Sequence, residues 1–337
     1  MYAPANGPFV TLHGRCLGEV KVGKNHLRDV GAADAAVGCF NAIRHSPGQD
    51  RRRPWVNGLA ELRGKGEDMA DVGLRKEGAS TEDEARYARL RRFNGVVGVI
   101  LLLQGVLMLI LSNDRTLPLT TNYLKSDPFT DGTLPPPSQV ASLRLGPMVA
   151  AFLLLSGIAL LLLTLPRVFE WYVGNLKKGA NYARWMEYSI TASLMIVVIA
   201  MLSGVFDLNT LILIFFLNMM MILFGWMMEL HNQTTSRTDW TAFLFGCLAG
   251  IVPWVVIALY FFSAVANPDA EVPTFVYFIL PILFVFFNVF AINMVLQYKK
   301  VGKWADYLYG ERVYIILSLL AKSALAWQVF AGTLRGS

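Results

Sequence analysis

The sequence predicts an all-α membrane protein built as a bundle of seven transmembrane helices. Hydrophobic residues make up 55% of the 337 residues and charged residues only 16%, well below the roughly 25% charged residues of typical soluble domains. Seven apolar runs, each near the ~20 residues that a helix needs to span a bilayer, cover about 93–112, 145–165, 185–203, 208–228, 240–263, 273–298 and 313–331. Together these observations exclude an ordinary soluble domain of this length.

The first 85 residues differ from the rest of the chain. They contain no sustained apolar periodicity and no hydrophobic core of the length that a signal peptide needs. We therefore expect a disordered or weakly folded extension over 1–85 and a seven-helix transmembrane domain over 86–337. The Arg51-Arg52-Arg53 cluster is better interpreted as part of a solvated tail than as a site for nucleic acid or anionic lipid, so no nucleic-acid partner is predicted.

A short helix is expected to lead into the first span. Ser80 is followed closely by three acidic residues at 82–84, a pattern typical of a capped helix N-terminus. We expect this helix to begin at Ser80 and to run through four arginines to the membrane.

Cysteine usage predicts neither a metal site nor a disulfide framework. The chain has three cysteines, Cys16, Cys39 and Cys247, and their spacing matches no metal-binding pattern. Cys247 lies inside an apolar run. We therefore expect no bound metal.

The distribution of Lys and Arg predicts the orientation of the bundle, because cytoplasmic connections carry an excess of these residues. The segment 86–92 and every second connection after it hold 13 Lys and Arg, whereas the segments on the opposite side hold four. The N-terminus should therefore be cytoplasmic and the C-terminus extracellular, in a multi-pass protein of the plasma membrane.

The connections between the spans carry their own signals. The segment 113–144 is rich in Thr and Pro and could form a small extended hairpin on the outer surface. Asp207 follows a tight turn and should cap the fourth helix. Pro253 and Pro281 fall inside the fifth and sixth spans, where they should kink the helices and border a cavity.

A lysine near the middle of the seventh span is the most informative residue of the chain. An ammonium at this depth is unfavourable by about 3 kcal/mol, so Lys322 needs an acidic partner or a covalent use such as a Schiff base with an aldehyde. The clearest intramembrane acid is Glu187 in the third span, and we expect the two side chains to meet. Arg184, three residues earlier, could hold Glu187 ionised or extend to the membrane surface. A salt bridge that only fixes helix packing is the alternative interpretation.

Further side chains are expected at the depth of Lys322. Ser318 lies one helical turn earlier and can hydrogen-bond near the lysine nitrogen, or instead bond its own helix backbone. Large or very small residues converge at the same level, namely Tyr188, Met221, Gly225, Trp254, Phe284 and Phe287. Such a set often reflects ordinary helix packing, but beside an isolated lysine it indicates a pocket for a long apolar aldehyde.

Six sequence segments carry a resemblance to a known family. They are Arg184-Trp-Met-Glu187-Tyr-Ser189, Ile222-Leu-Phe-Gly-Trp226, Phe245-Gly-Cys-Leu-Ala-Gly-Ile-Val-Pro-Trp254, Gly302-Lys-Trp304, Tyr307-Leu-Tyr-Gly-Glu-Arg312, and Ser318-Leu-Leu-Ala-Lys-Ser-Ala-Leu-Ala-Trp-Gln328. Over about 90–334 the chain resembles the heliorhodopsins, retinal-binding proteins with an inverted membrane topology. The orientation derived above from charge agrees with that topology.

The resemblance implies a cofactor and a site. Lys322 would carry all-trans retinal as a protonated Schiff base, with Glu187 as its counterion and Ser318 assisting. The implied pocket residues are Tyr188, Met221, Ile222, Gly225, Trp254, Phe284 and Phe287. The resemblance also implies a light-responsive homodimer with a slow photocycle, little or no ion transport and no enzyme activity.

This chain departs from many members of that family near the implied Schiff base. Those members place histidines of the first and second helices in a polar cavity, whereas no apolar run here contains a histidine. The aligned positions are Leu102 and Leu160. Gln104 and Asn218 remain as neutral polar candidates for that cavity.

The sequence therefore favours a light-sensing retinal protein that signals to an unidentified cytoplasmic protein. The alternative is a light-driven proton or ion transporter, but a pump needs carboxyl groups on both sides of the Schiff base and the spans show one. A third interpretation is a chromophore-free receptor or scaffold. A soluble partner could dock on the lysines of the cytoplasmic connections, although the topology requires those charges in any case.

Overall fold

The computed structural model describes residues 55–122, 136–269, 272 and 274–334, with side chains over 82–333 of these ranges. Its helices are α2 (Trp55–Leu111), α3 (Leu145–Leu162), α4 (Pro166–Leu176), α5 (Tyr182–Leu202), α6 (Leu208–His231), α7 (Thr241–Ala266), α8 (Thr274–Tyr298) and α9 (Tyr307–Val329), with short helical segments at Gly302–Ala305 and Phe330–Leu334. Two strands, β1 (Thr116–Thr121) and β2 (Ser138–Arg144), complete the described structure.

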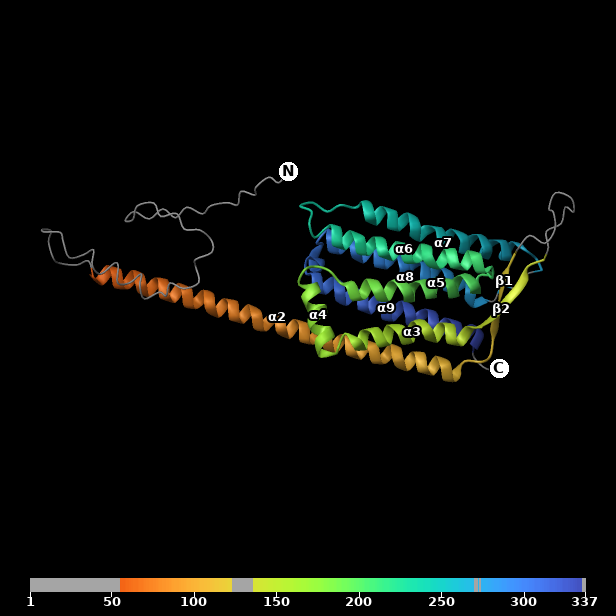
Figure 1. Ribbon diagram of the computed structural model, residues 1–337, viewed down its shortest axis with the longest axis horizontal. Helices are drawn as coiled ribbons and strands as arrows, with labels where there is room; N and C mark the ends of the chain where they lie inside the picture. Colours follow the sequence, from red (N-terminus) through yellow and green to blue (C-terminus); the bar gives the residue numbers. More distant parts are fainter. Residues whose placement is uncertain (1–54, 123–135, 270–271, 273, 335–337) are drawn as a thin grey trace, which may run out of the picture. The chain divides into compact units, whose positions relative to one another are not determined.

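The prediction of seven membrane-length helices is confirmed. In the described part of the chain, seven helical segments are long and apolar enough to cross a bilayer: Glu82–Leu111, Leu145–Leu162, Tyr182–Leu202, Leu208–His231, Thr241–Ala266, Thr274–Tyr298 and Tyr307–Thr333. The helices α3 and α5 to α9 run side by side, with α4 at one end and the two strands at the other (Figure 1). As helices, the spans satisfy most of their backbone hydrogen-bonding groups internally, as hydrocarbon surroundings require.

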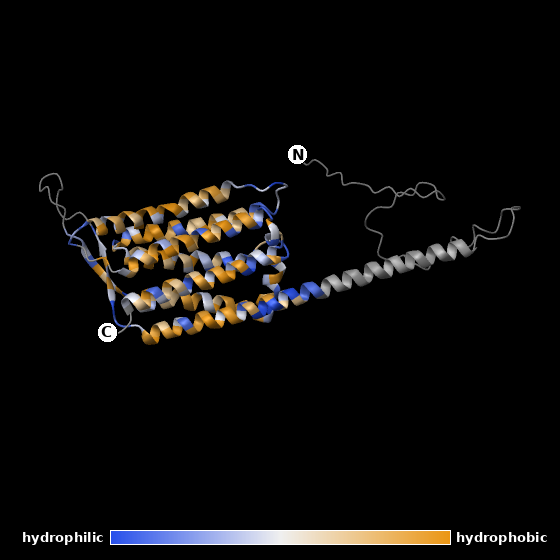
Figure 2. Ribbon diagram, turned by 180° about the vertical axis from the view of Figure 1, so that it is seen from behind, coloured by the Kyte–Doolittle hydropathy of each residue, from blue (hydrophilic) through white to orange (hydrophobic). Residues whose placement is uncertain are grey.

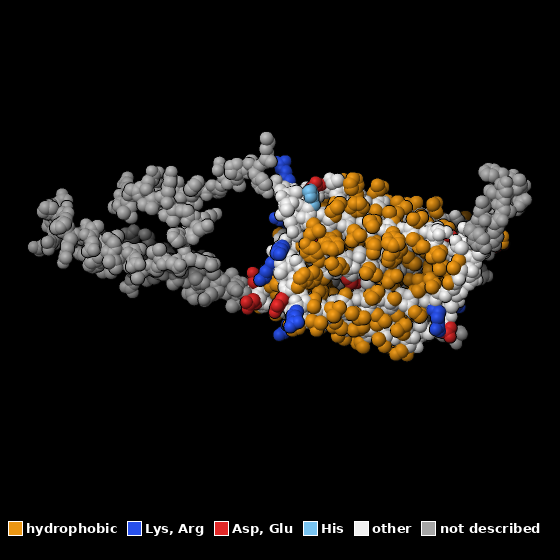
Figure 3. Space-filling view, viewed as in Figure 1, with side chains coloured by type: hydrophobic (Ala, Val, Ile, Leu, Met, Phe, Trp, Pro, Cys, Tyr) orange, Lys and Arg blue, Asp and Glu red, His pale blue; other side chains and the backbone are white. Residues whose placement is uncertain are grey.

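The surface of the bundle is apolar between two polar ends. The ribbon coloured by hydropathy shows hydrophobic residues along the helices and more hydrophilic ones near their ends (Figure 2). On the face seen in Figure 3, hydrophobic side chains cover the middle, whereas Lys, Arg, Asp and Glu gather toward the ends. Many large side chains in this band are exposed, among them Leu213, Leu248 and Phe262. A band of this kind is what lipid covers. The direction in which the bundle crosses the membrane stays a prediction.

The predicted start of the first helix is wrong. The helix α2 begins at Trp55, directly after Pro54, so Ser80 lies inside the helix rather than at its N-cap. The sequence from Trp55 to Leu111 contains no proline that would interrupt a helix, and a capping pattern does not stop a helix that has already begun. Most of the predicted extension over 1–85 lies outside the described residues, so the domain division remains a prediction.

The expected hairpin and the expected helix cap are present, whereas the expected proline kinks stay a prediction. The segment after α2 forms an antiparallel hairpin in which Thr116 pairs with Arg144. The Thr120 N–H donates to the Phe206 carbonyl at 2.9 Å, which attaches the hairpin to the turn before α6. Asp207 caps α6 as predicted, since its Oδ2 accepts from the Thr210 N–H at 2.8 Å. Pro253 and Pro281 lie inside α7 and α8.

The helix α5 lies at the centre of the bundle. It buries 11 of its 21 residues and packs against both α3 and α6, while α6 packs on α7 and α8 packs on α9. Its buried apolar face includes Met195, Ile196 and Ile199. Glu187 and Arg184 near its start are thus carried into the interior of the protein.

Candidate functional site

Lys322 and Glu187 meet inside the bundle. Lys322 lies on α9 and is only 3% exposed. Its Nζ lies 3.2 Å from Oε1 of Glu187 on α5, so the buried ammonium has the acidic partner expected from the sequence. Ser318, one turn earlier on α9, has its Oγ 2.6 Å from the same Nζ and bonds the lysine rather than its own helix backbone.

Glu187 is held by two further hydroxyl groups. Ser156 on α3 donates to Oε1 of Glu187, and Thr191 donates to the same oxygen at 2.7 Å. Hydrogen bonds to an ionised acceptor are stronger than neutral ones and favour the charged form. The carboxylate is therefore fixed beside the lysine from two helices.

Sequence reasoning missed both hydroxyl residues, although each had a signal. Thr191 lies four residues after Glu187, which places it on the same helix face. Ser156 is the single hydroxyl residue among the otherwise apolar residues of α3. Its direction toward Glu187 depends on how α3 and α5 pack, which the sequence does not give.

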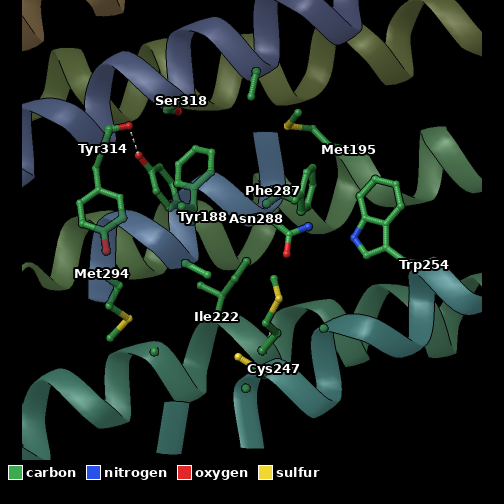
Figure 4. Close-up of a pocket in the computed structure, with 18 of the residues that line it drawn as sticks. Tyr188, Met195, Ile222, Cys247, Trp254, Phe287, Asn288, Met294, Tyr314 and Ser318 are labelled. Carbon is green, nitrogen blue, oxygen red and sulfur yellow. Dashed lines mark hydrogen bonds between the residues drawn. The ribbon is translucent and has the colours of Figure 1, made fainter. Parts of the chain in front are cut away.

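An apolar cavity of about 400 Å³ begins at Lys322 and extends between α5, α6, α7 and α8. Nine of the ten predicted site residues line it: Lys322, Ser318, Tyr188, Met221, Ile222, Gly225, Trp254, Phe284 and Phe287. The tenth, Glu187, lies on the other side of the lysine nitrogen and lines a second, smaller cavity. Figure 4 shows side chains from several helices pointing into the larger cavity.

Aromatic side chains form much of the wall of this cavity. The Trp254 ring meets Phe284 and Phe287 edge to face, with ring centroids 5.3 and 5.4 Å apart. Tyr188 is fixed by a 2.9 Å hydrogen bond from its hydroxyl to the Tyr314 carbonyl, drawn as a dashed line in Figure 4. The Tyr188 ring also lies 4.9 Å from Lys322 Nζ, a distance at which its π face attracts the ammonium.

Gly225 gives room for an aromatic ring beside the cavity. A Cβ atom at this position would lie 2.6 Å from Cζ3 of Trp185, closer than atoms approach. Trp185 cannot move away freely because its indole N–H donates to Glu229. The space beside Gly225 is thus filled by Trp185, and both residues line the cavity.

The cavity reaches the lipid-facing surface between α7 and α8. Phe284 on α8 is 39% exposed although it lines the cavity, and Cys247, Ile251 and Asn288 are likewise both lining and exposed. Cys247 and Asn288 are seen at the cavity in Figure 4. An apolar molecule in the cavity would therefore touch both protein and lipid.

The expectation for Arg184 is wrong. Arg184 neither pairs with Glu187 nor extends to the surface: it is 7% exposed and forms ion pairs with Glu229, at 3.1 Å, and with Glu311. Glu229, at the end of the fourth apolar run, is buried as well. Glu311 lies on α9, which begins at Tyr307. The seventh apolar run starts only at 313, so Glu311 precedes that run although it belongs to the same helix. Counting apolar runs therefore overlooked an ion cluster at the ends of three helices.

The two neutral polar candidates lie elsewhere in the bundle. Gln104 accepts a hydrogen bond from the Trp327 indole at 3.0 Å, and Asn218 donates to Ser193 at 3.1 Å. Neither lines the cavity at Lys322 or the smaller one at Glu187. Leu160, by contrast, forms part of the wall of the smaller cavity.

Comparison with known proteins identifies the family. A family model described as Heliorhodopsin matches residues 90–334, which is most of the chain and includes every helix that forms the site. No curated protein gave a match. Proteins of this family are photoreceptors rather than enzymes, and they bind retinal. The chain belongs to the heliorhodopsin family, a class of light-sensing, retinal-binding rhodopsins of the membrane.

Proposed function

We propose that this protein is a light sensor in which Lys322 holds all-trans retinal as a protonated Schiff base beside the counterion Glu187. The observation that carries the proposal is a buried amine at the end of an apolar cavity, 3.2 Å from a carboxylate. We further propose that the protein signals to a cytoplasmic partner and does not pump ions.

The lining residues fit this cofactor. A cavity of about 400 Å³ lies within the ~300–1,000 Å³ range of ligand pockets, and aromatic and aliphatic side chains suit a conjugated hydrocarbon chain. Lys322 offers the primary amine that an aldehyde requires. The hydrogen bond from Tyr188 to the backbone of α9 keeps one wall in place close to that amine.

Retinal, when bound, supplies absorption of visible light and a double-bond isomerisation. The residues of this chain control the charge at the Lys322 nitrogen. Glu187 favours the protonated nitrogen, because a nearby anion stabilises a cation in a water-poor site. Ser156 and Thr191 hold that anion in place, while Ser318 contacts the nitrogen from its own helix.

Two helices could carry the response to the surface. Lys322 and Glu187 lie on α9 and α5, so a displacement of the nitrogen acts on both. Pro253, next to the cavity residue Trp254, and Pro281 interrupt the hydrogen-bond ladders of α7 and α8, where bending needs little distortion. We propose that movement at these positions reaches the cytoplasmic face.

We propose a cytoplasmic N-terminus and an extracellular C-terminus, with the protein as a homodimer in the plasma membrane. The excess of Lys and Arg in alternate connections supports this orientation. Exposed lysines, among them Lys177, Lys178 and Lys303, could contact an unidentified cytoplasmic partner.

Transport remains the less favoured function. The buried Glu229 and Glu311 add acids that the sequence count had excluded, but both lie toward the same helix ends as Arg184. On the hairpin side of Lys322, the described contacts at Gln104 and Asn218 join neutral groups. A one-way proton path needs carboxyl groups on both sides.

The test is a visible spectrum of the purified protein after addition of all-trans retinal. We expect a coloured pigment in the wild type and in Lys303→Ala, which removes an exposed lysine, and none in Lys322→Ala. A pigment in Lys322→Ala, or a colourless wild type, would refute the proposal. Illuminated proteoliposomes should show no sustained pH change, and a sustained change would favour transport.

A further inference from the structure

A second cavity, of about 40 Å³, lies between Glu187 and the ion cluster around Arg184. It is enclosed by residues of α2, α3, α4, α5 and α9, and apolar side chains such as Leu160 form part of its wall. Polar side chains that line it include Asn94, Tyr172, Asn181, Arg184, Glu187 and Glu311. The counterion and a second buried acid thus border one small space.

Buried polar atoms at this cavity lack partners. Asn94 is fully buried, and neither its Nδ2 nor its Oδ1 makes a well-formed hydrogen bond in the described part of the chain, although the Tyr172 hydroxyl lies near it. Nε of Arg184 likewise makes no hydrogen bond there. Buried polar groups are nearly always satisfied by protein or by ordered water. A water needs roughly 10–15 Å³ of such space, so the cavity has room for about three.

Glu311, the second acid at this cavity, belongs to a cluster of two carboxylates and one cation. Arg184 faces both Glu229 on α6 and Glu311 on α9, and an unbalanced buried charge is unfavourable. One added proton would remove the imbalance.

The donors around the two acids show which one would take that proton. Glu229 accepts from Arg184, from the Tyr307 hydroxyl at 2.8 Å, from the Asn181 N–H at 2.9 Å and from the Trp185 indole. Four donors favour the ionised form.

Among the described residues, Glu311 accepts from two groups, Arg184 and the Asn181 side chain at 2.6 Å. Glu311 also lines the cavity, which Glu229 does not. The neighbouring Tyr172 on α4 does not compete with Glu311 for the proton. Burial raises the pKa of its phenol well above the usual value, so the phenol already carries its own proton. Glu311 is therefore the accessible acid with the weaker support for its charge.

We propose that the cavity holds a short chain of water molecules, through which Glu311 accepts the proton that leaves the Lys322 nitrogen after illumination. This inference rests on the proposed function. The N–H bond at Lys322 breaks and its electron pair stays on nitrogen. Glu187 takes the proton and passes one to the first water, each water accepts and releases one proton, and an O–H bond forms on Glu311. Glu187 returns to the anion that Ser156 and Thr191 stabilise.

The first test uses infrared difference spectra, light minus dark, of the retinal-loaded protein. We expect a positive band of a newly protonated carboxylic acid in the wild type, and loss of this band in Glu311→Gln. The matched control is Glu170→Gln, which removes an exposed acid of α4 and should keep the band. A band that persists in Glu311→Gln would overturn the proposal, and a shift of that band in Glu187→Asp would assign the proton to Glu187.

A second variant covers the case in which Glu311→Gln does not fold. Asn94→Leu keeps both acids but replaces the unpartnered amide with an apolar side chain. We expect the infrared band of protonated Glu311 to rise at least about tenfold more slowly, since a positioned proton relay contributes that much or more. An unchanged rate would contradict the water chain.

A third measurement needs no retinal. A high-resolution structure of the retinal-free protein should show ordered water in contact with Asn94 and Nε of Arg184, and an empty cavity would overturn the proposal. The dark visible spectrum keeps the two proposals apart: a wild type without colour refutes the proposed function, whereas a coloured wild type lacking the infrared band refutes only this inference.

Discussion

The substitution Glu187→Gln tests the electrostatic core of the site. It removes a negative charge 3.2 Å from Lys322 Nζ while keeping the size of the side chain. At an effective dielectric constant of ~20, two unit charges at this distance attract by about 5 kcal/mol. Since about 1.4 kcal/mol corresponds to one pH unit, the pH at which the dark pigment loses its proton and its colour should fall by about four units.

The assay is a series of dark absorption spectra of the retinal-loaded protein at increasing pH. The sign follows from the charge: an adjacent anion stabilises the protonated, coloured form, so its removal lets the colour disappear at lower pH. The absorption maximum should also move to longer wavelength. Glu187→Asp retains the charge and serves as the matched control, with a much smaller change. An unchanged bleaching midpoint and an unchanged maximum in Glu187→Gln would refute the counterion role.

Three further predictions concern the stability of the fold. Arg184→Gln leaves Glu229 and Glu311 buried without their cation and should lower the free energy of unfolding by about 3–5 kcal/mol, seen as a lower thermal midpoint. Gly225→Ala places a Cβ against Trp185 and should lower the free energy of unfolding by about 1–3 kcal/mol. It should also alter the absorption maximum. Removing retinal with hydroxylamine should lower the thermal midpoint, because a ligand bound only to the folded state stabilises that state.

Matched substitutions separate these effects from general damage. Arg237→Gln removes an exposed arginine and should leave the thermal midpoint unchanged. Gly174→Ala adds a Cβ on α4 where no atom lies within 4 Å, so it should be neutral or slightly stabilising. Equal losses in Arg184→Gln and Arg237→Gln would argue against a special role for the buried ion cluster. A fully stable Gly225→Ala would show that Trp185 can move away from α6.

The sequence was most informative about charged side chains inside the membrane, because few arrangements can stabilise them there. Lys322 and Glu187 are ionisable groups in long apolar runs, and the strong penalty for an isolated charge in hydrocarbon made their contact predictable. Most pocket residues could also be predicted, because side chains at one depth of a narrow bundle face a common space. Ile222 was implied by the family resemblance alone. Bounds of the spans were close to those observed, apart from the long extension of α2 before the membrane.

The missed features depend on packing between helices. Arg184 had two predicted positions and takes neither, because its partners Glu229 and Glu311 lie outside the apolar runs, at helix ends that turn out to be buried. A hydropathy pattern marks where a helix crosses the hydrocarbon, but not how far the protein interior extends beyond it. Asn94 was overlooked for the same reason. Its position at the start of the first apolar run gives no sign that other helices enclose it.

The guanidinium of Arg184 joins the ends of three helices, since Arg184 lies on α5, Glu229 on α6 and Glu311 on α9. Sliding α9 slightly along α5 would stretch the ion-pair contacts of this guanidinium, and its buried position keeps bulk solvent from replacing them. Small displacements of these three helices relative to one another are therefore resisted. Packed interfaces of this kind have discrete arrangements rather than a continuum. Under the proposed function, this cluster would hold α5, α6 and α9 in one arrangement against thermal motion until a movement of the Lys322 nitrogen acts on α9.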